Sequence, residues 1–193
     1  MQANASDIPA IGHNGGPALT TQGRGWATHC WGQARRSLLP HLPVEMVRLR
    51  VRRAAELGLD YKTYAGVRAT TGRDLVAFLF SSNALGLHAR RMVPDPVRGA
   101  RLAGLADCGR IALAQAPLTP ETVFTALPVL DAVAIAPAPH APPAIVRDRV
   151  RAALGTHPAA TVLLVGDTAW ERDWCAVAGL AGYLAADRYF HPV

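Results

Sequence analysis

The stretch Thr161–Leu180, TVLLVGDTAWERDWCAVAGL, carries the clearest indication of the fold. It opens with four apolar residues, Val162–Val165, a run short enough to be a strand that is buried on both faces. Asp167 follows this strand, and residues 170–178 have the character of a helix that stops at Gly179, because glycine commonly terminates helices. An acidic residue at the carboxyl end of a buried parallel strand is where α/β proteins place their chemistry. The stretch therefore indicates both a fold class and a candidate site.

From residue 74 onward the chain repeats one order of strand, turn and helix. Besides the strand of the opening stretch, apolar runs predict strands at residues 75–80, 110–114, 130–136 and 182–185. Helices are predicted at residues 120–127, 144–154 and 170–178, residues 86–107 are interpreted as an arginine-rich connection, and the apolar C-terminus, residues 189–193, is expected to dock. Such alternation is typical of a parallel sheet with helices on both faces. The predicted fold is α/β, a three-layer, Rossmann-like domain with a parallel sheet.

The residues before this domain divide into a tail and a helical extension. The first 25 residues carry Gly, Pro, Asn, Ser and Thr without periodicity, which is typical of a mobile tail. Three helices are then predicted at residues 26–39, 44–57 and 61–69, with Asp60 as the N-cap of the third. The predicted organisation is a tail at 1–25, a helical extension at 26–73 and an α/β domain at 74–193.

The last two helices of the extension are joined by a short turn that contains Gly58, and two interpretations stay open. One is a helix-turn-helix that would face DNA through Lys62, Arg68 and Arg73. The other is an amphipathic helical hairpin packed on the α/β domain. The second helix is short and poor in Asn, Gln and Arg, which favours the packed hairpin.

The composition indicates a globular protein. Half of the 193 residues are apolar and 18% are charged. No apolar run approaches the length of a membrane span, and the first residues lack the pattern of a secretory signal. The three cysteines are far apart and odd in number, which favours reduced thiols. Together with the alanine-, proline- and arginine-rich composition, these features predict a bacterial cytoplasmic protein.

The formal net charge of +6 is carried by arginine, since Lys62 is the single lysine. Such a charge is compatible with nucleic acid or an acidic protein surface as the partner. We favour a solvated arginine-rich surface over a nucleic-acid interface, so that another protein is the expected partner.

The order of elements in residues 74–190 resembles the haloacid dehalogenase-like (HAD) superfamily of aspartate-nucleophile phosphatases and dehalogenases. That family ends its fourth strand with Gly-Asp, places a second acid four residues later and closes the next helix with Ala-Gly. Gly166-Asp167, Glu171 and Ala178-Gly179 keep this spacing, with Glu in place of the usual Asp. The resemblance implies that Asp167 and Glu171 face one divalent cation, usually Mg²⁺.

The other motifs of the family are altered in this sequence. The family's first strand ends in Asp-x-Asp, which supplies the nucleophile and a general acid/base, whereas this chain has Phe80-Ser81-Ser82-Asn83. Its second strand ends in Ser or Thr, and this chain has Gln115. Its third site is a lysine, and the matching segment offers His140.

Loss of the nucleophile decides the predicted function. Without it the phosphoaspartyl route is lost, and Asp167 and Glu171 alone would bind Mg²⁺ weakly. A structural alternative is that Asp167 caps the following helix and Glu171 is an exposed first-turn acid. The sequence therefore predicts a catalytically degenerate HAD-like domain that acts as a protein-binding or regulatory module, with no cofactor other than weakly bound Mg²⁺.

Two alternative functions stay open. A hydrolase with altered chemistry would need one pocket on which the candidate side chains converge: Ser81, Ser82, Gln115, His140 and Asp167. A nucleic-acid binder would use the arginine-rich helices at 44–57 and 144–154. It would need one contiguous patch formed by Arg48, Arg52, Arg149 and Arg151.

Overall fold

The computed structural model describes Cys30 and residues 42–191. The chain divides into two compact units, Met1–Val44 and Glu45–Val193, and the second unit holds all the strands of the sheet. Apart from Cys30, which is helical and exposed, the predicted tail and the predicted helix at 26–39 lie outside the described residues.

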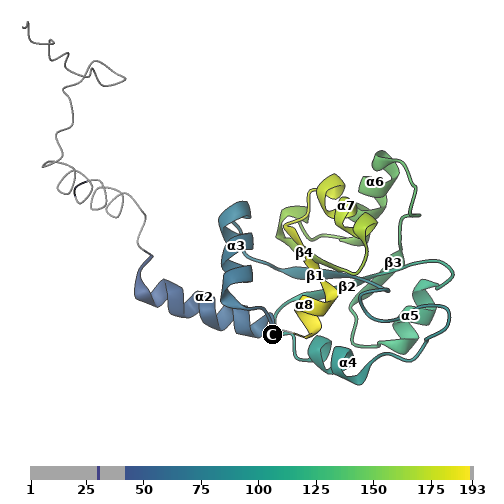
Figure 1. Cartoon of the computed structure of the whole chain (residues 1–193), viewed down its shortest axis with the longest axis horizontal. Coiled ribbons are helices and arrows are strands. Elements are labelled where there is room, and N and C mark those ends of the chain that lie inside the picture. Colours follow the sequence, from purple (N-terminus) through teal and green to yellow (C-terminus); the bar gives the residue numbers. More distant parts are fainter. Residues whose placement is uncertain (1–29, 31–41, 192–193) are drawn as a thin grey trace, which may run out of the picture. The chain divides into compact units, whose positions relative to one another are not determined.

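A five-stranded parallel sheet forms the centre of the second unit (Figure 1). Its strands are β1 (Ala77–Ser81), β2 (Gly109–Ala114), β3 (Ala132–Ile135), β4 (Val162–Gly166) and β5 (Gly182–Ala185). Their order is β3-β2-β1-β4-β5, and every neighbouring pair is parallel. The central strands β1 and β4 are buried along their whole length because helices cover both faces of the sheet, and their residues are apolar apart from Ser81. The predicted α/β fold with three layers is confirmed.

The two helical layers follow from the alternation of side chains along β1. Phe78 and Phe80 point to one face, where they share a core with buried side chains of five helices, and Leu79 points to the other, where it shares a core with buried side chains of two. The first layer consists of α2 (Val44–Glu56), α3 (Tyr61–Thr71), α4 (Pro96–Ala103), α5 (Pro120–Ala126) and α8 (Ala186–Phe190). The second consists of α6 (Pro143–Ala153) and α7 (Ala169–Ala178), and the short 3₁₀ turn η1 (Ala159–Thr161) precedes β4.

Several helix ends form where the sequence predicts them. Asp60 accepts a hydrogen bond from the Thr63 backbone N–H at 2.9 Å and so caps α3, and Pro120 occupies the first turn of α5. Gly179 ends α7 in the left-handed conformation, with φ of 70°, which glycine adopts without steric cost.

Two helices were not predicted from the sequence. The segment interpreted as a connection contains α4, which starts at Pro96 behind the N-cap Asp95 and buries Leu102. The prolines and glycines of this segment are typical of irregular structure, but a proline in the first turn is compatible with a helix. The C-terminus docks as predicted, but it does so as helix α8, with Tyr189 and Phe190 buried.

The hairpin of α2 and α3 packs on the sheet. Leu57, Leu59 and Tyr64 are buried in the same core as Phe78 and Phe80. This arrangement is that of a packed helical hairpin, which was the favoured interpretation, and its residues from 45 onward belong to the same compact unit as the sheet.

Candidate functional site

The carboxyl ends of three adjacent strands bring the predicted site residues together. Because β1 lies between β2 and β4, the segments that follow these three strands meet at one edge of the sheet. Asn83 comes after β1, Gln115 after β2 and Asp167 after β4. Glu171 reaches the same point from the first turn of α7.

The Glu171 side chain is fully buried and turns back toward the start of its own helix. Its Oε2 accepts hydrogen bonds from the backbone N–H groups of Asp167 and Thr168, at 2.6 and 2.9 Å. The N-cap of α7 is Thr168. The structural alternative was therefore right to give Glu171 a role at the helix terminus but wrong on two details. Glu171 is not exposed, because its carboxylate binds backbone donors inside the protein, and Asp167 is not the cap residue.

The second Glu171 oxygen binds two side-chain amides. Oε1 accepts from Asn83 Nδ2 at 3.2 Å and from Gln115 Nε2, while Asn83 Nδ2 also donates to Gln115 Oε1 at 2.7 Å. We call these three residues the Asn83–Gln115–Glu171 network. Each member interacts with the other two, and the carboxylate gains hydrogen bonds that offset the cost of its burial.

Gly166 makes room for this network. A Cβ atom at that position would lie 2.7 Å from Tyr183 Cε2 and 2.9 Å from Glu171 Oε2, which is closer than side-chain carbons approach. The Gly-Asp pair at the end of β4 and the acid four residues later therefore have a packing function of their own. The glycine admits the carboxylate, and the carboxylate binds the turn.

The two serines at the end of β1 are buried, and each hydroxyl accepts a hydrogen bond from the backbone. Ser81 Oγ accepts from the Ala84 N–H at 3.0 Å, and Ser82 Oγ accepts from the Gln115 N–H at 3.1 Å. Both residues have no exposed surface. His140 is exposed on the loop after β3, and among the described residues its side chain makes no hydrogen bond with a serine. Ser81, Ser82 and His140 do not form a nucleophile–base pair in this arrangement.

The acids at this edge do not present an open set of metal ligands. Both Glu171 oxygens face protein donors, and a cation would have to displace those hydrogen bonds. Asp167 is exposed. Within residues 42–191 there is no group of three or more His, Cys, Asp and Glu side chains that could hold a metal ion.

A groove lies beside the network, at the carboxyl ends of β2 and β3. Its volume is about 490 Å³, and it is mostly apolar. Its lining includes Gln115, Leu118, Ile135, Pro137, Pro139 and Arg149. Sequence reasoning missed this groove, although the proline-rich loop after β3 signalled an irregular, exposed segment.

The arginines proposed for nucleic acid do not form one patch. Arg48 pairs with Glu45 at 2.8 Å on α2. Arg151, on α6, donates from Nε to the Ala178 carbonyl at 3.1 Å. Since α2 and α6 cover opposite faces of the sheet, their arginines cannot share one contiguous surface. The requirement stated for a nucleic-acid binder is not met.

A search of the described helices for membrane-spanning segments found no candidate.

The geometry of the site is that of a buried carboxylate–amide network next to an open apolar groove. Comparison of the chain with protein-family models, with curated proteins and with solved structures gave no match.

Proposed function

We propose that this chain is a catalytically degenerate HAD-like domain that acts as a protein-binding or regulatory module in a bacterial cytoplasm. The single observation that carries the proposal is the Asn83–Gln115–Glu171 network. It occupies the junction of β1, β2 and β4, where the HAD family keeps its nucleophile and its cation. A carboxylate with four protein donors is a structural group, and the neighbouring serines are buried.

The open groove supports a binding role. It adjoins the edge strand β3, whose Ile135 is 60% exposed, and Phe124 on α5 is exposed close to the same strand. Exposed apolar side chains around an edge strand are typical of surfaces that accept an extended segment of another protein. Arg149 in the lining supplies a polar contact that orients such a segment.

Capture experiments with the full chain test the binding role. We expect proteins of the native host that bind the immobilised wild type to be lost with Ile135→Asp, because this change puts a charge into the groove. Val97→Asp is the matched control, since Val97 is an exposed apolar residue of α4 that does not line the groove. Identical captured proteins for both variants, or none for the wild type, would refute the groove as the binding surface.

A further inference from the structure

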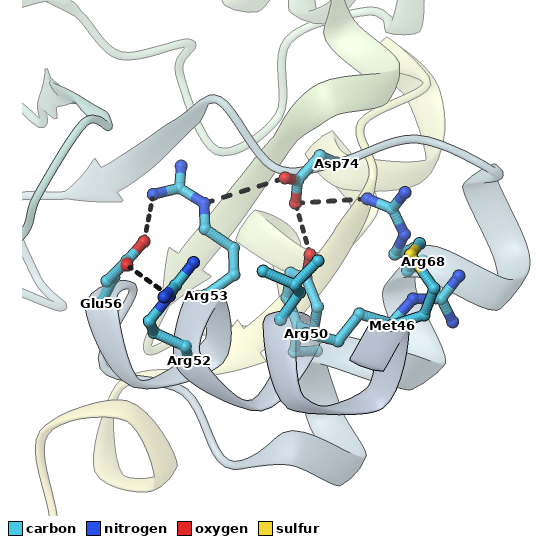
Figure 2. Close-up of a pocket in the computed structure, with 9 residues that line it drawn as sticks. Met46, Arg50, Arg52, Arg53, Glu56, Arg68 and Asp74 are labelled. Carbon is cyan, nitrogen blue, oxygen red and sulfur yellow. Dashed lines mark hydrogen bonds and ion pairs between the residues drawn. The ribbon is translucent and has the colours of Figure 1, made fainter. Parts of the chain in front are cut away.

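A second hollow lies at the amino ends of the strands, among α2, α3 and the segment that leads into β1. Its volume is about 270 Å³ (Figure 2). Asp74 in its wall precedes β1, whereas Asn83 of the network follows that strand, which spans about 16 Å. The hollow is therefore separate from the site at the carboxyl edge. We call it the arginine pocket, and four of its lining residues are Arg50, Arg52, Arg53 and Arg68.

The arginine pocket carries more positive than negative charge. Its acidic lining residues are Glu56 and Asp74, so that four guanidinium groups face two carboxylates and the formal charge of the lining is +2. Figure 2 shows Asp74 between Arg53 and Arg68, at 3.8 and 3.6 Å, and Glu56 beside Arg52 and Arg53, at 3.9 and 3.1 Å. Arg53 pairs with both carboxylates, Arg52 with Glu56 and Arg68 with Asp74, whereas Arg50 pairs with neither. Asp74 also accepts a hydrogen bond from the Tyr64 hydroxyl at 2.7 Å.

The arginines of the pocket differ in how much of their hydrogen-bonding capacity the protein uses. Arg53 donates to the carbonyls of Leu75, Ala106 and Asp107 and so ties α2 to the sheet. Arg50 makes no hydrogen bond or ion pair with any described residue, and its Nε is buried. Arg68 forms an ion pair of 3.6 Å with Asp74 and also interacts with the Tyr64 hydroxyl, which leaves other donors of its guanidinium group unused. Arg50 and Arg68 thus bring unused, fork-shaped donors to one small pocket.

We propose that the arginine pocket binds the dianionic phosphoryl group of a phosphate monoester. A phosphate monoester carries about two negative charges at neutral pH, which matches the formal charge of the lining, and its oxygens fit the guanidinium fork. Met46 and Leu49, 39% and 48% exposed, provide an apolar wall for the group that carries the phosphate. Two sources present this chemistry, a small phosphorylated metabolite and a phosphorylated side chain of a protein.

Binding of phenyl phosphate to the full chain at low salt, measured by calorimetry, tests the proposal. Phenyl phosphate supplies both the dianion and an apolar group, so we expect it to bind more tightly than inorganic phosphate. Arg50→Gln should weaken binding about tenfold or more, since it removes charge-assisted hydrogen bonds. The change removes no hydrogen bond or ion pair with a described residue, and thermal unfolding checks that the fold is kept. Arg48→Gln, on the same helix but outside the pocket, should change affinity less than twofold.

The outcomes separate the sources of the ligand and the failure of the proposal. A phosphoserine peptide that binds more tightly than phenyl phosphate assigns the site to a protein, and the reverse order assigns it to a metabolite. If benzoate, which carries one negative charge, bound as tightly as phenyl phosphate, the proposed preference for a dianion would be wrong. The absence of saturable binding, or equal losses in the two variants, would also overturn the proposal. If the chain binds an oligonucleotide and both variants weaken that binding equally, the arginines would serve a nucleic-acid surface and the proposal would be wrong. Because the arginine pocket lies apart from the groove and the network, none of these outcomes depends on the proposed function.

Discussion

Glu171 binds four hydrogen-bond donors inside the protein, two from the backbone and two from side-chain amides. This coordination by the protein explains why an acid can be fully buried beside apolar strands. It also explains the spacing of Gly166, Asp167 and Glu171 without a bound cation. The residue types and their spacing were evident from the sequence, but the inward direction of the carboxylate was not, because it depends on Asn83 and Gln115, which follow two other strands.

Glu171→Gln should destabilise the protein. The amide has one acceptor oxygen instead of two, so its NH₂ group would face an N–H donor whichever way it turns. We expect the free energy of unfolding to fall by about 2–4 kcal/mol in urea denaturation. Asp173→Asn, an exposed residue of the same helix, should change it by less than about 0.5 kcal/mol. A loss no larger for Glu171→Gln than for this control would show that the network does not stabilise the fold.

At the scale of elements, the junction between β4 and α7 depends on close approach. Gly166→Ala would place a methyl group against Tyr183 and Glu171, and should lower the free energy of unfolding by about 1–3 kcal/mol. Gly66→Ala, inside α3 with no atom within 4 Å of the added carbon, should raise it by about 0.5–1 kcal/mol. Urea denaturation of the two variants measures the contrast, and changes of equal sign would contradict the tight packing of this junction.

Asp131, the residue before β3, links the start of that strand to the start of β2 through hydrogen bonds with Arg110. Its carboxylate accepts from the Arg110 backbone N–H at 2.7 Å and from Arg110 Nη2 at 3.0 Å. The hydrogen bonds from the Arg110 side chain, and less strongly from its backbone, hold the pKa of Asp131 below its usual value. A lowered pKa means that this stabilisation is complete above pH about 4 and is lost as the pH falls through the folded-state pKa.

The pH dependence of unfolding checks this contribution. The stability difference between wild type and Asp131→Asn should be constant from neutral pH down to about pH 5 and should shrink below about pH 4. Asp148→Asn, an exposed acid of α6, should show no such change. A difference that grows on acidification would contradict the sign of the shift.

The elements also show which local sequence signals are sufficient to locate a helix or its end. Helix α5 and the Gly179 terminus of α7 follow from capping residues that act within a few positions. Helix α4 was missed because Pro94, Pro96 and two glycines suggest an irregular segment, although Asp95 and Pro96 are compatible with a helix start and the burial of Leu102 stabilises the helix there. Local patterns thus located most elements, whereas tertiary packing decided the remainder.

At the scale of the whole molecule, the strand–helix rhythm predicted the parallel sheet, and hence which segments meet at its carboxyl edge. It did not predict the groove or the arginine pocket. The groove needs β3 to be an edge strand, and the pocket needs α2, α3 and Asp74 to come together. Both depend on contacts between segments that are distant in sequence, and no short motif announces them.

We propose that the carboxyl edge of the sheet holds a structural carboxylate network in place of a phosphatase centre. Hydrolysis of p-nitrophenyl phosphate by the full chain with Mg²⁺ tests it most directly, with the Asp167→Asn variant measured in parallel. We expect the wild type and the variant both to release product no faster than buffer with Mg²⁺ alone. Hydrolysis by the wild type above that background, abolished by Asp167→Asn, would contradict it.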